Sequence, residues 1–434
     1  MSDKQDRPSR HLPVRPNLNQ LKHQAKDLLR DIRRGVPSAI EEFNQHHPKL
    51  VAPSEAKLAD AQLALARSYQ APSWLRLVQA CRLVDAIWRD DIAAVREMVM
   101  KNPSLLHEDA LVRKSNWGPP MSYAANLGRD EIIKMLHLLG ATDLESAMDR
   151  AGLQSKIETA RLLWGMGALD RFGGRPPDGA LSGAAYTLSV TGTALVLELG
   201  GQVVDANGKR LAPVDVVLET DSRKPQAKHQ ILEMYAQDGL KLPDTPPMAL
   251  HRGRIDLLEE HLRRDPHLFQ RTFTHEEIFP PELGCHDEVQ ATQGTPLAGT
   301  TLLHLCADYD EIETARWLLE KGMDVDVRAA VDGEGFGGHS ALFGTVVSQP
   351  NFWMNYQGGA QQAPLTQLLL DHGADPNARA SLRKQLHPGY APKHDVTLHE
   401  YCDVTPLGWG RSFHAKVFVS EPAMRLIDAA GGRE

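Results

Sequence analysis

The sequence predicts an all-α fold in which about nine degenerate helix–turn–helix units stack into a solenoid, with long loop insertions and an N-terminal helical cap. Two observations predict it. Residues 301–326 read as one complete unit, and signals for the end of a helix recur along the chain. Because a single unit of this kind cannot bury its own hydrophobic face, its presence indicates a stacked array.

The complete unit reads TLLHLCADYDEIETARWLLEKGMDVD, and each part has a physical task. The Thr301 hydroxyl can cap the first helix, and His304 can tie the loop backbone to that helix. Cys306 and Ala307 are small enough for a second helix to pack against them. Gly322 stands where the second helix should end, a position that favours positive φ. An apolar stripe at helical spacing is expected on the second helix, formed by Ile312, Ala315, Leu318 and Leu319.

Comparable helix-ending signals divide the chain into units of unequal length. Gly167 and Gly200 are 33 residues apart, whereas the last three intervals are 57, 51 and 58 residues long. Each long interval is expected to carry an insertion of roughly 20 residues, since insertions in repeat arrays lie in loops. The expected ends are Asn102, Gly140, Gly167, Gly200, Gly239, Asp265, Gly322, Gly373 and Gly431.

These patterns resemble bacterial multi-ankyrin-repeat proteins across roughly residues 83–432, and 33 residues is the ankyrin period. The strongest matches are residues 119–141, 300–328, 364–379 and 404–410. One alternative stays open: ALVLELGGQVVDANG at 194–208 could instead form two strands joined by an Asn207–Gly208 turn.

The N-terminal segment differs from the rest. Residues 1–16 are polar and Pro-rich, which favours a disordered tail over a signal peptide. Residues 17–82 contain amphipathic helical patterns and are expected to form a leader that caps the first repeat. Compact repeats are then expected over 83–270, and repeats with long insertions over 271–434.

Composition favours a cytoplasmic protein without affinity for nucleic acid or membranes. The net charge is −8, so no basic footprint is present. The four cysteines are far apart and form no CxxC pair, which favours reduced thiols. No stretch approaches the roughly 20 apolar residues that span a bilayer.

Two segments imitate functional motifs. Gly333, Gly335 and Gly338 have GxGxxG spacing, but no hydrophobic strand precedes them, so a turn between repeats is expected instead of a nucleotide site. The insertion at 271–299 gathers histidine, cysteine and carboxylate side chains without the spacing of a known zinc site. A solvated polar loop is the expected state there, and a metal site completed by another loop is the alternative.

The function predicted from the resemblance is a non-catalytic scaffold that binds a protein partner through the concave face and loop insertions of an ankyrin solenoid. No cofactor or bound metal is expected, and no catalytic motif is present. The partner and the oligomeric state stay open, including a self-associating module. A metal-binding or enzymatic site built from the insertions at 271–299, 331–359 and 381–401 is the competing hypothesis. The candidate partner-binding residues are Arg252, Arg254, His275, Glu276, Trp353, Tyr356, Tyr390, Trp409 and Arg411.

Overall fold

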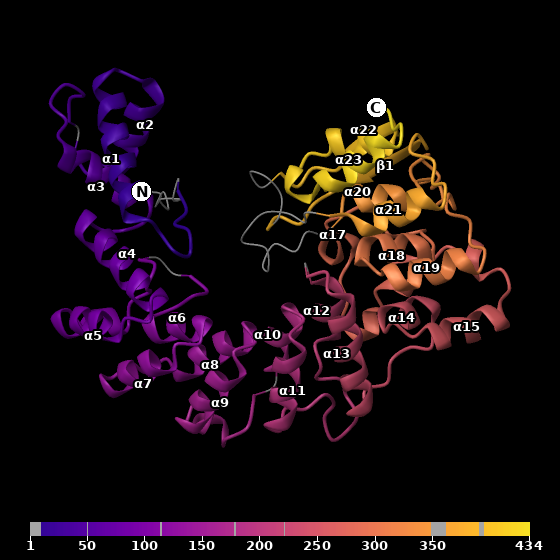
Figure 1. The fold of residues 1–434 in the computed structure, drawn as a ribbon, viewed down its shortest axis with the longest axis horizontal. Helices are drawn as coiled ribbons and strands as arrows, with labels where there is room; N and C mark the ends of the chain where they lie inside the picture. Colours follow the sequence, from indigo (N-terminus) through magenta and orange to yellow (C-terminus); the bar gives the residue numbers. More distant parts are fainter. Residues whose placement is uncertain are drawn as a thin grey trace. The chain divides into compact units, whose positions relative to one another are not determined.

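A computed structural model describes residues 10–49, 51–112, 115–177, 179–220, 222–348, 362–389 and 395–434. The chain divides into two compact units, Met1–Arg175 (unit 1) and Pro176–Glu434 (unit 2). Both consist mainly of short helices (Figure 1).

Unit 1 begins with four helices: α1 (Leu18–Arg33), α2 (Pro37–His46), α3 (Leu58–Ser68) and α4 (Trp74–Trp88). The Asn17 side chain caps α1 by accepting hydrogen bonds from two backbone N–H groups of its first turn. The buried stripe of α1, which includes Leu21 and Ile32, faces α2 and α3. The expected boundary after residue 82 falls inside α4.

The expectation of a disordered tail over 1–16 is wrong for residues 10–16. Leu12 is buried, and Arg10 forms a two-pronged ion pair with Glu42. The Val14 carbonyl accepts a hydrogen bond from the Tyr123 hydroxyl. A Pro-rich sequence pattern cannot show these partners, because they come from positions far along the chain.

The rest of unit 1 consists of helix pairs. They are α5 (Ile92–Lys101), α6 (Pro120–Leu127), α7 (Asp130–Leu138), α8 (Leu144–Leu153) and α9 (Ile157–Gly165), with short 3-10 turns at Pro103–Leu106 and Asp170–Phe172. Helix α4 packs on α6, α6 packs on α8, and α5 packs on α7. Corresponding helices of neighbouring pairs therefore lie side by side within this unit.

Unit 2 continues the same arrangement with more helices. They are α10 (Leu181–Tyr186), α11 (Val190–Glu198), α12 (Val214–Glu219), α13 (Pro225–Gln237), α14 (Pro246–His251), α15 (Ile255–Arg264), α18 (Leu302–Tyr309), α19 (Ile312–Glu320), α20 (Ala341–Val346), α21 (Pro364–Asp371), α22 (Pro406–Ser412) and α23 (Glu421–Ala429). Helices α14, α18, α20 and α22 pack in succession, and α19, α21 and α23 form a parallel row (Figure 1). The hydrophobic core of unit 2 runs between these rows.

The predicted helix ends coincide with helix ends in the structure. Seven of the nine are glycines with positive φ: Gly140, Gly167, Gly200, Gly239, Gly322, Gly373 and Gly431. Asn102 and Asp265 instead end α5 and α15 with φ values of −141° and −131°. Glycine is favoured at the first group because a side chain there would be strained.

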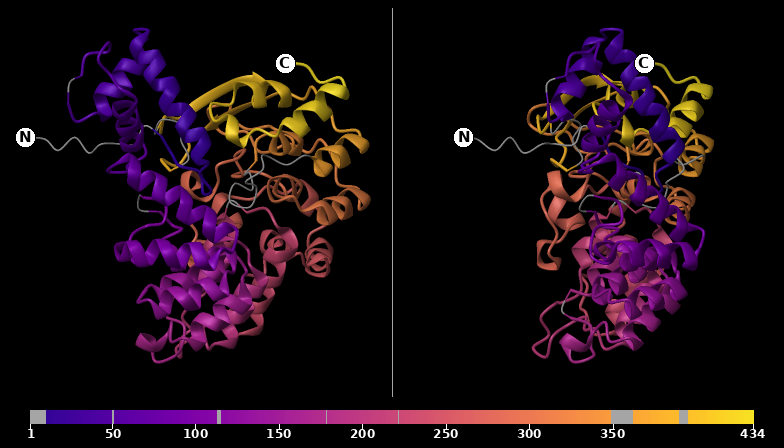
Figure 2. Two further views of the ribbon diagram at one scale, coloured as in Figure 1. Left: turned by 60° about the vertical axis from the view of Figure 1, so that its left-hand side comes forward. Right: turned by 90° about the vertical axis from the view of Figure 1, so that its left-hand side faces the viewer.

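The fold is mostly helical but not all-α, which corrects the predicted fold class. Strands β1 (Ala380–Lys384) and β2 (His399–Val404) pair antiparallel, and β2 packs against α22 (Figure 2). The segment 194–208 shows features of both structures predicted for it, a helix and a turn between extended residues. Its first part lies in α11, while Val204 bridges to Arg210 around a turn that contains Gly208 at φ +78°.

The insertion at 271–299 is not the solvated loop that was expected. It forms α16 (His275–Ile278), a 3-10 turn at Pro281–Leu283 and α17 (Glu288–Ala291). Its apolar side chains belong to the core of unit 2, including Phe273, Ile278 and Phe279. The alternation of these residues with charged ones concealed a buried face.

Candidate functional site

In the complete unit at 301–326, the Thr301 hydroxyl is hydrogen-bonded to the His304 ring and does not accept from a backbone N–H of α18 as was predicted. The Thr301 N–H donates to Nδ1 of His304, and Nε2 of His304 donates to the His339 carbonyl at 2.9 Å. This histidine therefore joins the start of α18 to the loop that precedes α20. Burial lowers the pKa of His304 to about 4, so the ring is neutral at physiological pH.

Two ion pairs are buried beneath this unit. Lys228 Nζ lies 2.8 Å from Glu311 Oε1, and the two side chains are 2% and 3% exposed. His229 Nε2 is also 2.8 Å from Glu311 Oε1. Burial alone would raise the pKa of the Glu311 carboxyl, but Lys228 and His229 together outweigh it and lower that pKa.

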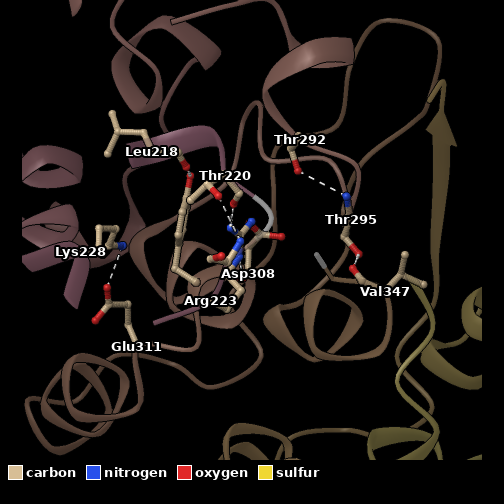
Figure 3. Close-up of polar contacts among 12 residues, drawn as sticks. Leu218, Thr220, Arg223, Lys228, Thr292, Thr295, Asp308, Glu311 and Val347 are labelled. Atoms are coloured by element: carbon tan, nitrogen blue, oxygen red, sulfur yellow. Dashed lines mark hydrogen bonds and ion pairs between the residues drawn. The ribbon is translucent and has the colours of Figure 1, made fainter. Parts of the chain in front are cut away.

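The second pair joins Arg223 to Asp308, with 2.9 Å between guanidinium and carboxylate. The Arg223 guanidinium also lies over the Tyr309 ring, and Lys228 Nζ lies 4.0 Å from the centroid of the same ring. Figure 3 shows both pairs close together, with Thr295 and Val347 on the far side of Asp308. These contacts tie the loop before α13 to α18, so we interpret the cluster as a clamp between neighbouring helix pairs.

A cavity of about 460 Å³ lies entirely within unit 2. We call it the insertion cavity, because its walls come from three segments that lie in or next to the predicted insertions. They are residues 288–299, the turn at 330–339, and the hairpin of β1 and β2. The residues that line it include Glu288, Pro296, Val331, Asp332, Phe336, His339, Arg383, Lys384 and Leu398.

The glycine-rich segment forms one wall as a tight turn, as expected for a non-nucleotide role. The Asp332 N–H donates to the Phe336 carbonyl, and Gly337 bridges to Val331 and Ser381. Gly337 has φ +117°, and a Cβ there would lie 2.0 Å from the Ala330 carbonyl oxygen. Only glycine fits this approach of two backbones.

The two basic side chains at the insertion cavity, Arg383 and Lys384, differ in their ion-pair partners. Arg383 pairs with Asp332 at 2.7 Å and with Glu334, and it lies over the Phe336 ring. Lys384 is 2% exposed, and its Nζ donates one hydrogen bond, to the Thr292 carbonyl at 2.8 Å. Among the described residues, no carboxylate lies within ion-pair distance of this ammonium group.

Apolar side chains that line the same cavity are also exposed. Val331 is 61% exposed and Leu398 is 50% exposed, and the neighbouring Val396 is 45% exposed. His339, by contrast, is buried: its Nε2 donates to the Pro296 carbonyl, and Nδ1 makes no hydrogen bond within the described residues. The cavity thus combines exposed apolar contacts with buried polar groups, which is typical of binding sites.

The candidate residues that the structure describes lie in three separate places: between α14 and α15, in α16, and in α22. Arg252 is half-buried and pairs with Glu233, and Arg254 pairs with Asp256 near the surface. Arg411, at the end of α22, pairs with Glu434. Trp353, Tyr356 and Tyr390 lie outside the described residues.

Trp409 needs a correction, because it has no exposed surface. Its Nε1 donates to Thr295 Oγ1 at 3.1 Å, and its ring contacts Tyr401 and Phe413. It is a core residue of α22 in this structure, so no side-chain surface is left for a partner.

The polar residues of the 271–299 insertion make local contacts. Nε2 of His275 is hydrogen-bonded to the His286 carbonyl, and His286 Nδ1 is 2.6 Å from Glu219. Glu276 is exposed. Burial raises the pKa of the Cys285 thiol. Within the described ranges, no three histidine, cysteine or carboxylate side chains gather closely enough to share a metal ion.

The sequence contains local signals for two of the segments that line the insertion cavity. Arg383 and Lys384 stand in the predicted insertion at 381–401, and ASLRK alternates buried and half-exposed residues as a strand does. The glycine-rich segment was predicted to be a turn between repeats, without a role in a binding site. Nothing local indicated that the two segments would meet.

Comparison with known proteins identifies the repeat. Residues 298–330 match the ankyrin repeat family model. The chain therefore contains an ankyrin repeat, and it lies at the helix pair of α18 and α19. No curated protein matches the chain.

A solved structure similar to this chain is the human ASB11 ankyrin repeat domain, at 14% sequence identity. The match covers 73% of this chain and 99% of that domain, with a TM-score of 0.26. A TM-score of this size does not establish a common arrangement over the matched length. Separately, none of the helices in the described part of the chain is long and apolar enough to cross a membrane.

Proposed function

We propose that this protein is a non-catalytic scaffold that binds a protein partner, built as an ankyrin solenoid whose contacts with the partner lie on unit 2. The observation that carries the proposal is the ankyrin repeat at 298–330, embedded in a row of packed helix pairs. Ankyrin repeats generally mediate contacts between proteins, and stacked repeats present one continuous surface.

The insertion cavity supports placing the contact on unit 2. Large apolar side chains are exposed there, at Val331 and Leu398, beside polar groups that are already fixed in position. Exposed apolar residues beside a concave surface are typical of interaction sites. Rigid positioning by β1 and the glycine-rich turn reduces the entropy that binding would cost.

The experiment compares partner capture by the full chain and by surface variants in an extract of the source organism. The double variant Val331→Ser and Leu398→Ser should retain less of a partner that the unmodified chain captures reproducibly. Val417→Ser is the matched control, because Val417 is 52% exposed in the same unit and lies outside the cavity. Equal capture by all three proteins would contradict the placement of the contact at the insertion cavity.

Substitutions are preferable to deleting residues 271–299. That deletion would remove Phe273, Ile278 and Phe279 from the core of unit 2, where all three are buried. Loss of binding would then reflect unfolding, since removing one such side chain already costs about 2–5 kcal/mol.

A further inference from the structure

The buried ammonium group of Lys384 points to the kind of partner that the insertion cavity fits. Lysine is rarely fully buried without a counter-ion, because removing its charge from water is costly. Here the side chain is 2% exposed and has one hydrogen bond, to a neutral carbonyl. Two of its N–H groups have no hydrogen-bond partner among the described residues.

The carboxylates nearest to Lys384 do not replace a counter-ion. Asp308 attracts Lys384 electrostatically but is paired with Arg223. Glu288 also attracts it and lines the cavity, yet it is half-exposed and beyond ion-pair distance. Asp332 is held by Arg383. Burial lowers the pKa of Lys384, and its amino group has no carboxylate within ion-pair distance among the described residues.

Apolar contacts accompany this amino group. Leu382 and Leu398 line the cavity with Lys384, and Val331 closes it on the side of the glycine-rich turn. Lys384 and His399 are cross-strand partners, so the hairpin of β1 and β2 fixes the position of the lysine backbone. A ligand that contacted both the Lys384 amino group and the apolar side chains of the cavity would contain a carboxylate and an adjacent apolar group.

We propose that the insertion cavity binds an acidic side chain of a protein partner, an aspartate or glutamate flanked by apolar residues, with Lys384 as its counter-ion and Val331 and Leu398 as its apolar contacts. This rests on the proposed function as a protein-binding scaffold. A segment of a protein fits better than a small anion, because the exposed apolar side chains would be left uncovered by an anion alone.

The test uses random linear peptides displayed on a carrier through their C-terminal ends, so that no free terminal carboxylate is present. Peptides selected on the full chain should share an aspartate or glutamate beside aliphatic or aromatic residues. A synthetic, C-terminally amidated copy of a selected peptide should bind with an affinity measurable by fluorescence anisotropy. Exchanging its acidic residue for the amide should weaken binding at least about tenfold.

The protein variant Lys384→Met should cause a similar loss, and the two losses should not add when combined, because each removes the same contact. Leu398→Ser provides a second variant. Because this side chain is exposed, its substitution should not impair folding. Lys321→Met is the control, since Lys321 is half-exposed at the end of α19 and should leave the affinity unchanged.

Three results would overturn the proposal. Selected peptides could lack an acidic residue, their binding could be insensitive to both Lys384→Met and Leu398→Ser, or only peptides with a free C-terminal carboxylate could bind. If peptides or partner proteins bind tightly but ignore Lys384, the cavity proposal fails while the scaffold proposal stands. If no peptide binds and partner capture is also absent, both fail.

Discussion

Units 1 and 2 are both built from helix pairs, but they differ in how deeply their charged side chains are buried. In unit 1, ion pairs such as Lys134 with Glu131 and Lys101 with Glu97 are exposed to solvent, and the pair of Arg76 with Glu108 is partly buried. Unit 2 instead buries Lys228 with Glu311 and Asp308 with Arg223. In the described ranges, the buried lysines, aspartates and glutamates all belong to unit 2.

The buried pairs of unit 2 join separate helix pairs, because Lys228 of α13 contacts Glu311 and Arg223 contacts Asp308 of α18. A plain stack of helix pairs is thin, so a charged side chain can reach water from almost any position. In unit 2 the residues of α18 from Leu302 to Tyr309 are all buried. A buried charged side chain needs an oppositely charged partner. The ion pairs therefore restrict how neighbouring helix pairs can pack on one another.

The largest expected effect comes from breaking a buried pair. Glu311→Ala should lower the free energy of unfolding of unit 2 by about 3–5 kcal/mol, because it leaves Lys228 buried without a partner. Urea unfolding followed by tryptophan fluorescence measures it. Glu131→Ala, in the exposed pair of unit 1, should cost less than about 1 kcal/mol.

The double variant Lys228→Met with Glu311→Leu is the check on mechanism. It should recover most of the loss, because apolar residues of similar volume replace the buried pair. Failure to recover would indicate that packing, and not the unpaired charge, accounts for the effect of the single substitution.

A medium effect is expected from acid. Burial lowers the pKa of His304 to about 4 and that of His339 to about 3, against about 6.5 in the unfolded chain. The unfolded state therefore binds more protons below pH 6.5. Stability present above that pH is lost as the pH falls toward 4, by about 2 kcal/mol per histidine at pH 5.

Urea midpoints at pH 7 and pH 5 measure this loss. The variant His304→Gln should show a smaller difference between the two pH values than the unmodified protein, since it removes one proton-binding group. An unchanged difference would contradict the assignment of this histidine.

A smaller effect should be shared by both units. Gly140→Ala in unit 1 and Gly322→Ala in unit 2 should each cost about 1–2 kcal/mol, because both glycines have positive φ and open space around the Cβ position. Gly165→Ala is the control, since that residue lies in α9 and should tolerate alanine. Thermal unfolding compares the three variants.

The smallest effect is expected for an exposed pair in unit 2. Arg254→Ala should change the free energy of unfolding by less than about 1 kcal/mol, because Arg254 and Asp256 are 36% and 61% exposed. A loss as large as that of Glu311→Ala would show that the position in unit 2, and not burial, explains the contrast between the units.

Local sequence patterns were sufficient to predict the helix pairs and their ends. In the predicted stripe, Ala315, Leu318 and Leu319 are buried and Ile312 is half-buried, and Gly322 follows the end of α19 at φ +92°. The leader helix α1 was predicted from the spacing of its apolar residues. The pairing of β1 with β2 was missed, because the intervening segment reads as a polar loop.

The candidate site depended on contacts that no local pattern contains. Arg223 and Asp308 are 85 residues apart, and Lys384 bonds to a carbonyl 92 residues away. The sequence by itself determined where helices begin and end, because those choices depend on backbone conformation and on neighbours within a few residues. Tertiary structure alone decided that Trp409 is core and Lys384 is buried, because burial depends on what the insertions cover.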